Sequence, residues 1–179
     1  RPATYRARTD GATLWWRFND SSWEVLDSSG AVNSGTAYFP MYPGSTTGVS
    51  GQAFILDPAG GYVVSSRAAV DTSSSFTVSA WVRTDNAAGS QVALSQKGTT
   101  VHGFSLGRDA GTGKWAFTMP RSDSTGAVLD SVLSDNAGAT GVYVHLAGVY
   151  DDAADTINLF VNGAPKTPVT RLDTSEWSA

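Results

Sequence analysis

The 179-residue sequence predicts an all-β fold, a sandwich of two antiparallel sheets. Three observations lead to this prediction. First, apolar and polar residues alternate in short runs, which is the period of a strand with one buried face. Second, the runs recur about every ten residues, with Gly, Ser, Asp and Asn clusters between them, as in β-sandwiches. Third, nineteen glycines and abundant Ser and Thr disfavour helices and favour short strands with tight turns.

The alternation is clearest in three segments. Their apolar faces are Leu14, Trp16 and Phe18 in 13–18; Phe76, Val78, Ala80 and Val82 in 75–84; and Ile157, Leu159 and Val161 in 156–163. Further strands are predicted at 51–57, 61–66, 91–96, 103–108, 114–119 and 142–150. Asn162-Gly163 predicts a two-residue hairpin, because a type I′ turn needs positive φ at both central positions.

Three other segments lack a clear strand pattern. Residues 1–12 are mostly polar and are expected to lead into a single domain over 13–179. Residues 31–50 form a predicted long loop with aromatic residues inside it, and loops of that length are usually functional or disordered. Residues 126–136 place apolar residues at nearly helical spacing, but Ser, Asp and Gly surround them, so a strand or an irregular segment is favoured.

The composition argues against several classes of function. The chain has no cysteine, so it forms no disulfide and no thiolate metal site. Its net charge of −4 argues against nucleic acid or an anionic membrane as a partner. No apolar stretch approaches the roughly 20 residues of a membrane-spanning helix. The chain begins without a methionine or an apolar signal core, which we interpret as a piece of a longer or processed precursor.

Two motifs, "FTVSAWVRT" and "HLAGVYD…INLFVNG", resemble those of the laminin G-like (LamG/LamGL) domains of bacterial extracellular proteins. These domains belong to the concanavalin A-like lectin/glucanase superfamily, and the resemblance covers about residues 13–178. It implies a two-sheet antiparallel jelly-roll sandwich in a secreted or cell-surface protein. The same jelly roll carries sugar binders, protein-binding modules, spacers and glycosidases, so the resemblance specifies the fold more closely than the function.

One departure from the family concerns the end of the chain. Laminin G-like domains continue after the "VNG" hairpin through closing strands, whereas this chain stops at "RLDTSEWSA". A sandwich without closing strands has an unpaired edge, which proteins normally cover. We therefore expect the missing strands to come from a partner chain, a cleaved fragment or a rearranged terminus. The alternative is that the chain is simply cut short.

The favoured function is a non-catalytic binding module that recognises a glycan or protein ligand through loops at the rim of the sandwich. Two alternatives stay open. One is a structural spacer or interaction domain whose open strand edge pairs with another chain or a missing C-terminal fragment. The other, less favoured, is a glycosidase fragment.

No catalytic residues are predicted. Glycosidases need two carboxylates that face each other at roughly 5–10 Å. The chain has only two glutamates, Glu24 and Glu176, and lacks the Glu-x-Asp-x-x-Glu strand that the resemblance leads us to look for. No nucleophile-elbow sequence accompanies the two histidines, His102 and His145.

Two acidic segments are candidate cation sites. The cluster Asp151, Asp152 and Asp155 lacks the ligand spacing of an EF-hand, so a turn is favoured, although Asp151 is placed to reach the rim as a ligand. Asp27 to Gly30 resemble the start of a structural calcium loop of related domains, with Asp20 nearby. The candidate ligands of Ca²⁺ are thus Asp20, Asp27, Gly30 and Asp151. The alternative for the Asp27 loop is an Asx-type turn.

Four aromatic residues are candidate ligand-binding side chains. Tyr38, Phe39 and Tyr42 lie in the predicted loop 31–50, and Trp81 lies opposite the core-facing stripe of 75–84. Sugar rings stack their apolar C–H faces on such flat side chains. The alternatives are that the loop aromatics pin the loop to the sandwich and that Trp81 is buried between layers.

Overall fold

The computed structural model describes residues 11–38, 41–56, 60–86, 88–172 and 177–179, with side chains left out at 41–45. In these ranges the chain forms β-strands, turns and irregular segments without a helix. The chain divides into two compact units, residues 1–69 and 70–179, called unit 1 and unit 2. The single domain expected over 13–179 stays a prediction.

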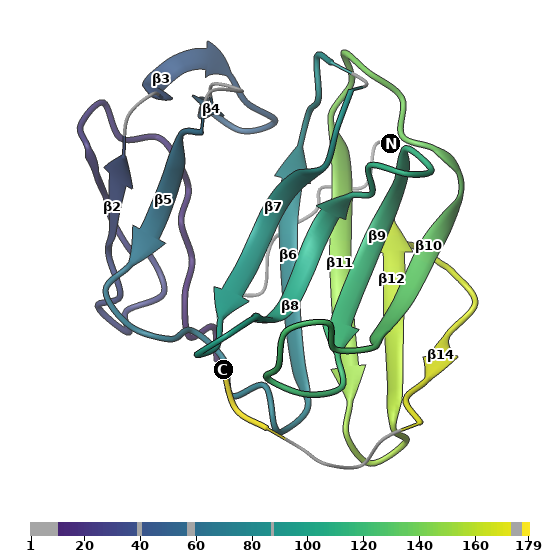
Figure 1. Ribbon diagram of the computed structural model, residues 1–179. Coiled ribbons are helices and arrows are strands. Elements are labelled where there is room, and N and C mark those ends of the chain that lie inside the picture. Colours follow the sequence, from purple (N-terminus) through teal and green to yellow (C-terminus); the bar gives the residue numbers. More distant parts are fainter. Residues whose placement is uncertain (1–10, 39–40, 57–59, 87, 173–176) are drawn as a thin grey trace. The chain divides into compact units, whose positions relative to one another are not determined.

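Unit 1 contains two small antiparallel sheets (Figure 1). One has the order β1 (Glu24–Val25), β2 (Gly35–Tyr38) and β5 (Tyr62–Ser65), and the other pairs β3 (Met41–Thr47) with β4 (Gln52–Leu56). The predictions at 51–57 and 61–66 are confirmed by β4 and β5. The predicted long loop at 31–50 is wrong, because β2 and β3 both lie inside it. In β2 the small residues Gly35 and Ala37 are buried and Thr36 and Tyr38 are exposed, so the strand alternates without large apolar residues.

The strand predicted at 13–18 is also wrong. Trp16 forms only an isolated bridge to Asp27, and Phe18 has a φ of 56°, which no extended strand allows. The donors of this segment bond to loop acceptors instead of a neighbouring strand. The Trp15 N–H donates to Oδ1 of Asp27 at 3.0 Å, and the Trp16 indole donates to the carbonyl of Asn33 at 3.1 Å.

Unit 2 is a two-sheet antiparallel sandwich (Figure 1). One sheet has the order β10 (Leu129–Ala137), β9 (Lys114–Pro120), β8 (His102–Arg108) and β7 (Gln91–Lys97). The other has the order β13 (Ala164–Pro165), β12 (Thr156–Val161), β11 (Val144–Asp151) and β6 (Phe76–Val82), and β14 (Val169–Thr170) also pairs with β12. The strands predicted at 75–84, 91–96, 103–108, 114–119, 142–150 and 156–163 are confirmed, and 126–136 contributes to β10.

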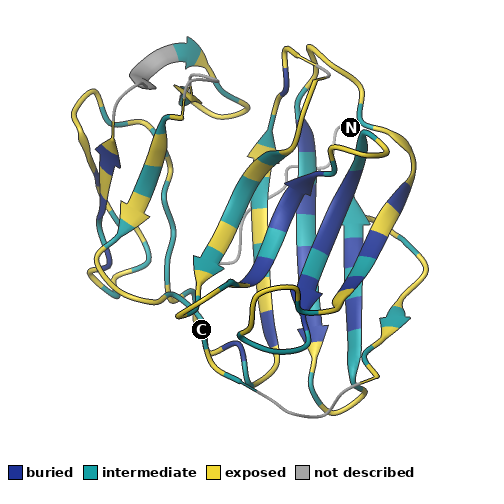
Figure 2. Cartoon of the chain, in the orientation of Figure 1, coloured by how far each residue is buried: buried dark blue, intermediate teal, exposed yellow. Residues whose placement is uncertain are grey.

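The core of unit 2 lies between the two sheets, where buried residues concentrate in the central strands (Figure 2). One sheet contributes Phe104, Leu106, Phe117 and Met119, and the other Phe76, Leu146, Tyr150, Ile157 and Leu159. Burying a side chain of this size contributes about 1.5–3 kcal/mol. Gly148 on β11 lets the sheets approach closely, because a Cβ there would lie 2.4 Å from the Phe117 ring.

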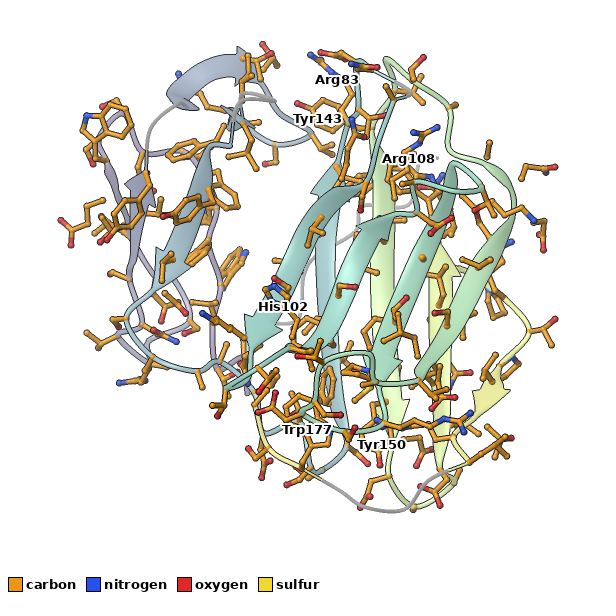
Figure 3. The ribbon with its side chains drawn as sticks, in the orientation of Figure 1. Arg83, His102, Arg108, Tyr143, Tyr150 and Trp177 are labelled. Carbon is orange, nitrogen blue, oxygen red and sulfur yellow. The ribbon has the colours of Figure 1, made fainter. Side chains whose placement is uncertain are left out.

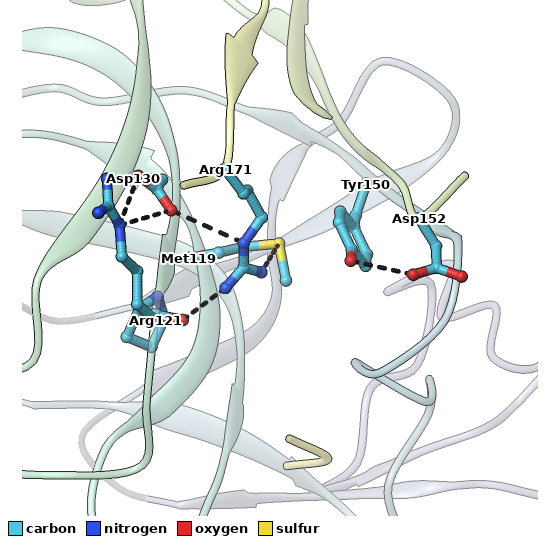
Figure 4. Close-up of polar contacts among 7 residues, drawn as sticks. Met119, Arg121, Asp130, Tyr150, Asp152 and Arg171 are labelled. Carbon is cyan, nitrogen blue, oxygen red and sulfur yellow. Dashed lines mark hydrogen bonds and ion pairs between the residues drawn. The ribbon is translucent and has the colours of Figure 1, made fainter. Parts of the chain in front are cut away.

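A buried ion cluster attaches β14 to the edge of the sandwich (Figure 4). Asp130, only 3% exposed, accepts from Nε and Nη2 of Arg121, and Nε of Arg171 lies 3.7 Å from its other oxygen. The Arg171 guanidinium also donates to the carbonyl of Pro120 at 2.9 Å and lies over the Tyr150 ring. An inward-pointing charge on edge strand β10 is thereby neutralised by hydrogen bonds, as burial of a charge requires.

Candidate functional site

An aromatic surface occupies the outer side of the sheet that contains β6 and β11. Trp81 on β6 lies opposite His145 on β11 in the strand register, with ring centroids 5.1 Å apart. Residues that alternate with Trp81 point into the core, so Trp81 itself faces outward and is 45% exposed. At the same end of the sandwich, the Arg83 guanidinium lies 5.4 Å from the Tyr143 ring (Figure 3). We call Trp81, Arg83, Tyr143 and His145 the Trp81 face.

The hairpin turn fixes the position of His145. The His145 N–H donates to the side-chain carbonyl of Asn162 at 2.9 Å, and the Asn162 N–H donates to the His145 carbonyl at 2.8 Å. Asn162 and Gly163 have φ angles of 52° and 80°, which confirms the turn predicted from their sequence. The turn therefore holds the end of β11 and with it the imidazole beside Trp81.

Together with Asp85, the Trp81 face carries no net charge near neutral pH. Arg83 donates from Nε and Nη2 to the two oxygens of Asp85, at 3.0 and 3.1 Å. These hydrogen bonds, together with the charge of Asp85, raise the pKa of Arg83. Burial lowers the pKa of His145 below its ordinary 6.5, so its imidazole is neutral near pH 7. An ion pair and a neutral imidazole thus surround Trp81.

Unit 1 contains a second exposed aromatic pair. Tyr38 on β2 stacks on Tyr62 on β5, with centroids 5.1 Å apart and planes inclined by 17°. Tyr38 therefore lies on a strand and not in the expected loop, and its neighbour Tyr62 was missed. The signal was present in 61–66, where Tyr62 and Val64 share one exposed face. Of the other candidates, the Tyr42 backbone pairs with Ile55, while Phe39 and the Tyr42 side chain lie outside the described part.

Donors from its own loop and from Trp15 occupy the acceptor sites of the Asp27 carboxylate. It accepts from the N–H groups of Trp15, Ser29 and Asn33 and from the Ser29 hydroxyl, at 2.8 to 3.0 Å. Burial alone raises the pKa of Asp27, but the hydrogen bonds from Asn33, Ser29 and Trp15 outweigh it and lower the pKa to about 2. A carboxylate offers about four lone-pair sites, and here N–H and O–H donors occupy all of them. This arrangement is that of an Asx-type turn, the alternative that the sequence left open.

The other candidate cation ligands also serve turns. Asp20 accepts the Leu26 N–H at 3.3 Å, and Gly30 has a φ of 89° in an exposed turn. Asp151, in unit 2, accepts the Ala154 N–H at 3.2 Å in the β11–β12 turn. Among the described residues, no group of three or more His, Cys, Asp or Glu side chains could hold a metal ion. Calcium binding stays an untested prediction, and the described geometry does not favour it.

Aspartates elsewhere in unit 2 likewise shape bends. Asp123 accepts three consecutive N–H groups, those of Thr99, Thr100 and Val101, at 2.7 to 2.8 Å, and so joins the β7–β8 turn to the β9–β10 loop. The bond from Val101 is the largest cause of the lowered pKa of Asp123. Of the two glutamates, Glu24 is exposed on β1 and Glu176 lies outside the described residues. A facing pair of these two glutamates is therefore not seen in the described part.

The antiparallel sandwich with an outward aromatic face defines a jelly-roll class of β-protein that includes lectins and binding modules. Residues 57–178 match the model of a laminin G-like family described as the concanavalin A-like lectin/glucanases superfamily. The chain belongs to this family, as its motifs indicated. No curated protein and no solved structure matches the chain. The match covers β5 and nearly all of unit 2.

Membership of this family indicates the general class of function. Laminin G-like domains generally bind glycan or protein ligands, are typically extracellular and are typically non-catalytic, although the superfamily includes glycosidases. In the described part of the chain, no helix is long and apolar enough to cross a membrane.

Proposed function

We propose that the chain is a non-catalytic binding module of a secreted or cell-surface protein, which recognises a glycan or protein ligand through the Trp81 face. The observation that carries the proposal is the half-exposed Trp81 ring held beside His145. Large aromatic side chains gain most from burial, and tryptophan is enriched where ligands bind. Because the Trp81 ring is partly exposed to water, a ligand that covers this ring would gain a favourable free energy of binding.

This proposal puts the binding surface on strands, whereas the sequence suggested rim loops. Trp81 is fixed by β6, and His145 by β11 and the turn after β12. A site on strands is more rigid than one on loops, so little ordering entropy opposes binding. The proposal therefore expects ligand recognition by a pre-formed surface.

A binding experiment with matched tryptophan variants tests the proposal. A glycan array and a panel of extracellular matrix proteins identify a ligand, and calorimetry measures its affinity for Trp81→Ala. Loss of the indole should lower the affinity about tenfold or more. Trp23→Ala is the control, because Trp23 is 49% exposed but lies in unit 1. Equal affinities of the wild type and Trp81→Ala would contradict the proposal.

The open edge of β6 supports a second candidate function. Among the described residues, β6 is the last strand in the order of its sheet, and a strand from another chain could pair with its other side. In that case the chain is an interaction domain whose partner supplies a strand. Light scattering would show a dimer or larger assembly, or a complex with the partner fragment. A monomer of 18.7 kDa that binds no fragment would exclude this candidate.

A further inference from the structure

A row of small hydroxyl residues continues the Trp81 face along β6. Ser79 and Thr77 follow Trp81 at alternate positions, and all three are exposed while their neighbours point inward. Alternate residues of a strand are about 6.6–6.8 Å apart, so the row from Trp81 to Thr77 spans roughly 13 Å. Beside it on β11 lie Ala147, opposite Ser79, and Val149, opposite Thr77. These two side chains are too short to interrupt a ligand that lies along β6.

The two ends of this row differ from each other in their chemistry. Trp81 offers a flat apolar ring, whereas Ser79 and Thr77 offer hydroxyl groups that donate and accept hydrogen bonds. A sugar chain presents the same combination, because each ring has apolar C–H faces and hydroxyls around its edge. A peptide of apolar side chains would leave the hydroxyls of Ser79 and Thr77 without partners.

The charge of the face decides which sugar chains it accepts. Asp85 occupies Nε and Nη2 of Arg83, so the one cation of the face is already neutralised. The Asp85 side chain is itself 68% exposed, so an incoming ligand meets an ion pair without net charge. An acidic chain would lose hydration of its charges on binding without gaining a free cation. A neutral chain does not have this penalty.

We propose that the Trp81 face binds an uncharged sugar chain lying along β6, with one ring on Trp81 and the following rings over Ser79 and Thr77, and that Asp85 excludes acidic chains. This inference rests on the proposed function and adds the ligand class, the direction of the chain and a specificity-determining residue. Asp85 acts on specificity by pairing with Arg83, so that no free cation is offered to an acidic chain.

Chain length gives the first test. Calorimetry compares neutral gluco-, manno- and xylo-oligosaccharides, each as a disaccharide and as a tetrasaccharide. At least one neutral series should bind, and its tetrasaccharide should bind more tightly than its disaccharide. Thr77→Val should reduce the tetrasaccharide affinity about two- to tenfold and leave the disaccharide affinity unchanged, because only the longer chain reaches Thr77. Ser79→Ala should reduce the affinity for both lengths, because the second ring already lies over Ser79. Equal affinities of the wild type for both lengths, or an equal loss for both lengths in Thr77→Val, would overturn the inference.

Charge gives the second test. Oligogalacturonate of the same length should bind the wild type at least about tenfold more weakly than the best neutral chain. Asp85→Asn frees the Arg83 guanidinium, so oligogalacturonate affinity should rise several-fold and fall again with added salt, while neutral chains bind as before. Asp135→Asn is the control, because Asp135 on β10 pairs with Lys166, just after β13, and its carboxylate is 74% exposed. An unchanged preference in Asp85→Asn would overturn the role of Asp85.

The outcomes separate this inference from the proposed function. If a sugar binds through Trp81 but shows no length dependence, or if acidic chains bind best, only the inference fails. If only a protein ligand binds through Trp81, the proposed function holds and the inference fails. If no ligand depends on Trp81, both fail. Circular dichroism and Trp81→Phe, which keeps a ring at this position, exclude misfolding as the cause of lost binding.

Discussion

At the scale of single residues, Asp27 shows how an acidic side chain shapes a loop. Asp27→Asn leaves one acceptor oxygen and places an NH₂ group where donors now point, so we expect a loss of about 1–3 kcal/mol in the free energy of unfolding. Urea denaturation at neutral pH measures this loss. Asp20→Asn, which affects one bond of 3.3 Å, should have a much smaller effect. Similar losses in the two variants would contradict this account of the loop.

The Asp27 carboxylate should also make the stability of the fold depend on pH. The pKa of Asp27 is about 2 in the folded chain, against an ordinary value of 3.8. The depressed pKa means that its stabilisation is fully present above about pH 4 and is lost as the pH falls toward 2. Asp27→Asn should therefore show a shallower loss of stability in this acid range than the wild type.

His145 gives a pH dependence in a different range. Burial lowers the pKa of His145 below 6.5, so between the two values the unfolded chain binds a proton that the folded chain does not. Its contribution is fully present above about pH 6.5 and is lost as the pH falls. His145→Gln should flatten the decline of the melting temperature between about pH 7.5 and pH 5. His102→Gln is the control, because His102 is exposed at the start of β8. An unchanged slope in His145→Gln would contradict the burial argument.

At the scale of elements, the ion cluster of Asp130 should matter far more than an exposed ion pair. Asp130→Asn leaves Arg171 and Arg121 without their buried partner, and such losses amount to about 3–5 kcal/mol. Asp135→Asn removes an ion pair whose carboxylate is 74% exposed, which should cost about 0–1 kcal/mol. Denaturant midpoints of the two variants test this difference. Comparable effects would show that β14 is not anchored as described.

The elements differ in how far the sequence predicts them. β6 and β12 alternate large apolar and polar residues, and Asn162-Gly163 has turn chemistry that needs no tertiary information. β2 was missed because its buried side is built from Gly35 and Ala37, which carry no strong strand signal. The segment 13–18 has a strand pattern, but the acceptors of Asp27 and Asn33 bind its donors. The local sequence pattern does not predict the structure correctly where residues distant in the sequence supply the hydrogen-bond partners.

At the scale of the whole molecule, close contact between the two sheets of unit 2 depends on Gly148. Gly148→Ala places a Cβ about where the Phe117 ring now lies, and overpacking of this kind costs about 1–3 kcal/mol. Gly111→Ala is the control, because its nearest atom, a carboxylate oxygen of Asp109, would be 3.5 Å away. Thermal unfolding should separate the two variants, and equal melting temperatures would contradict the close approach of the sheets.

The fold class and the family could be predicted from alternation and motifs, but the assembly of the site could not. The outward direction of Trp81 follows from the alternation within β6. Its neighbour His145 is brought to it by the register of β6 with β11, and Tyr62 reaches Tyr38 by the register of β5 with β2. A single sequence does not specify these pairings. The calcium expectation came from the family motif, whereas the bonds to Asp27 depend on the folded loop.

The most direct test of the account is a map of the ligand contacts. An NMR titration of the labelled chain with the tightest-binding neutral oligosaccharide follows every backbone amide and the indole N–H of each tryptophan. We predict that the largest shifts occur at Trp81 and His145 and extend along β6 to Ser79 and Thr77. Shifts confined to other surfaces, with the Trp81 indole unmoved at saturation, would contradict the central claim that the outer face of β6 and β11 is the binding site.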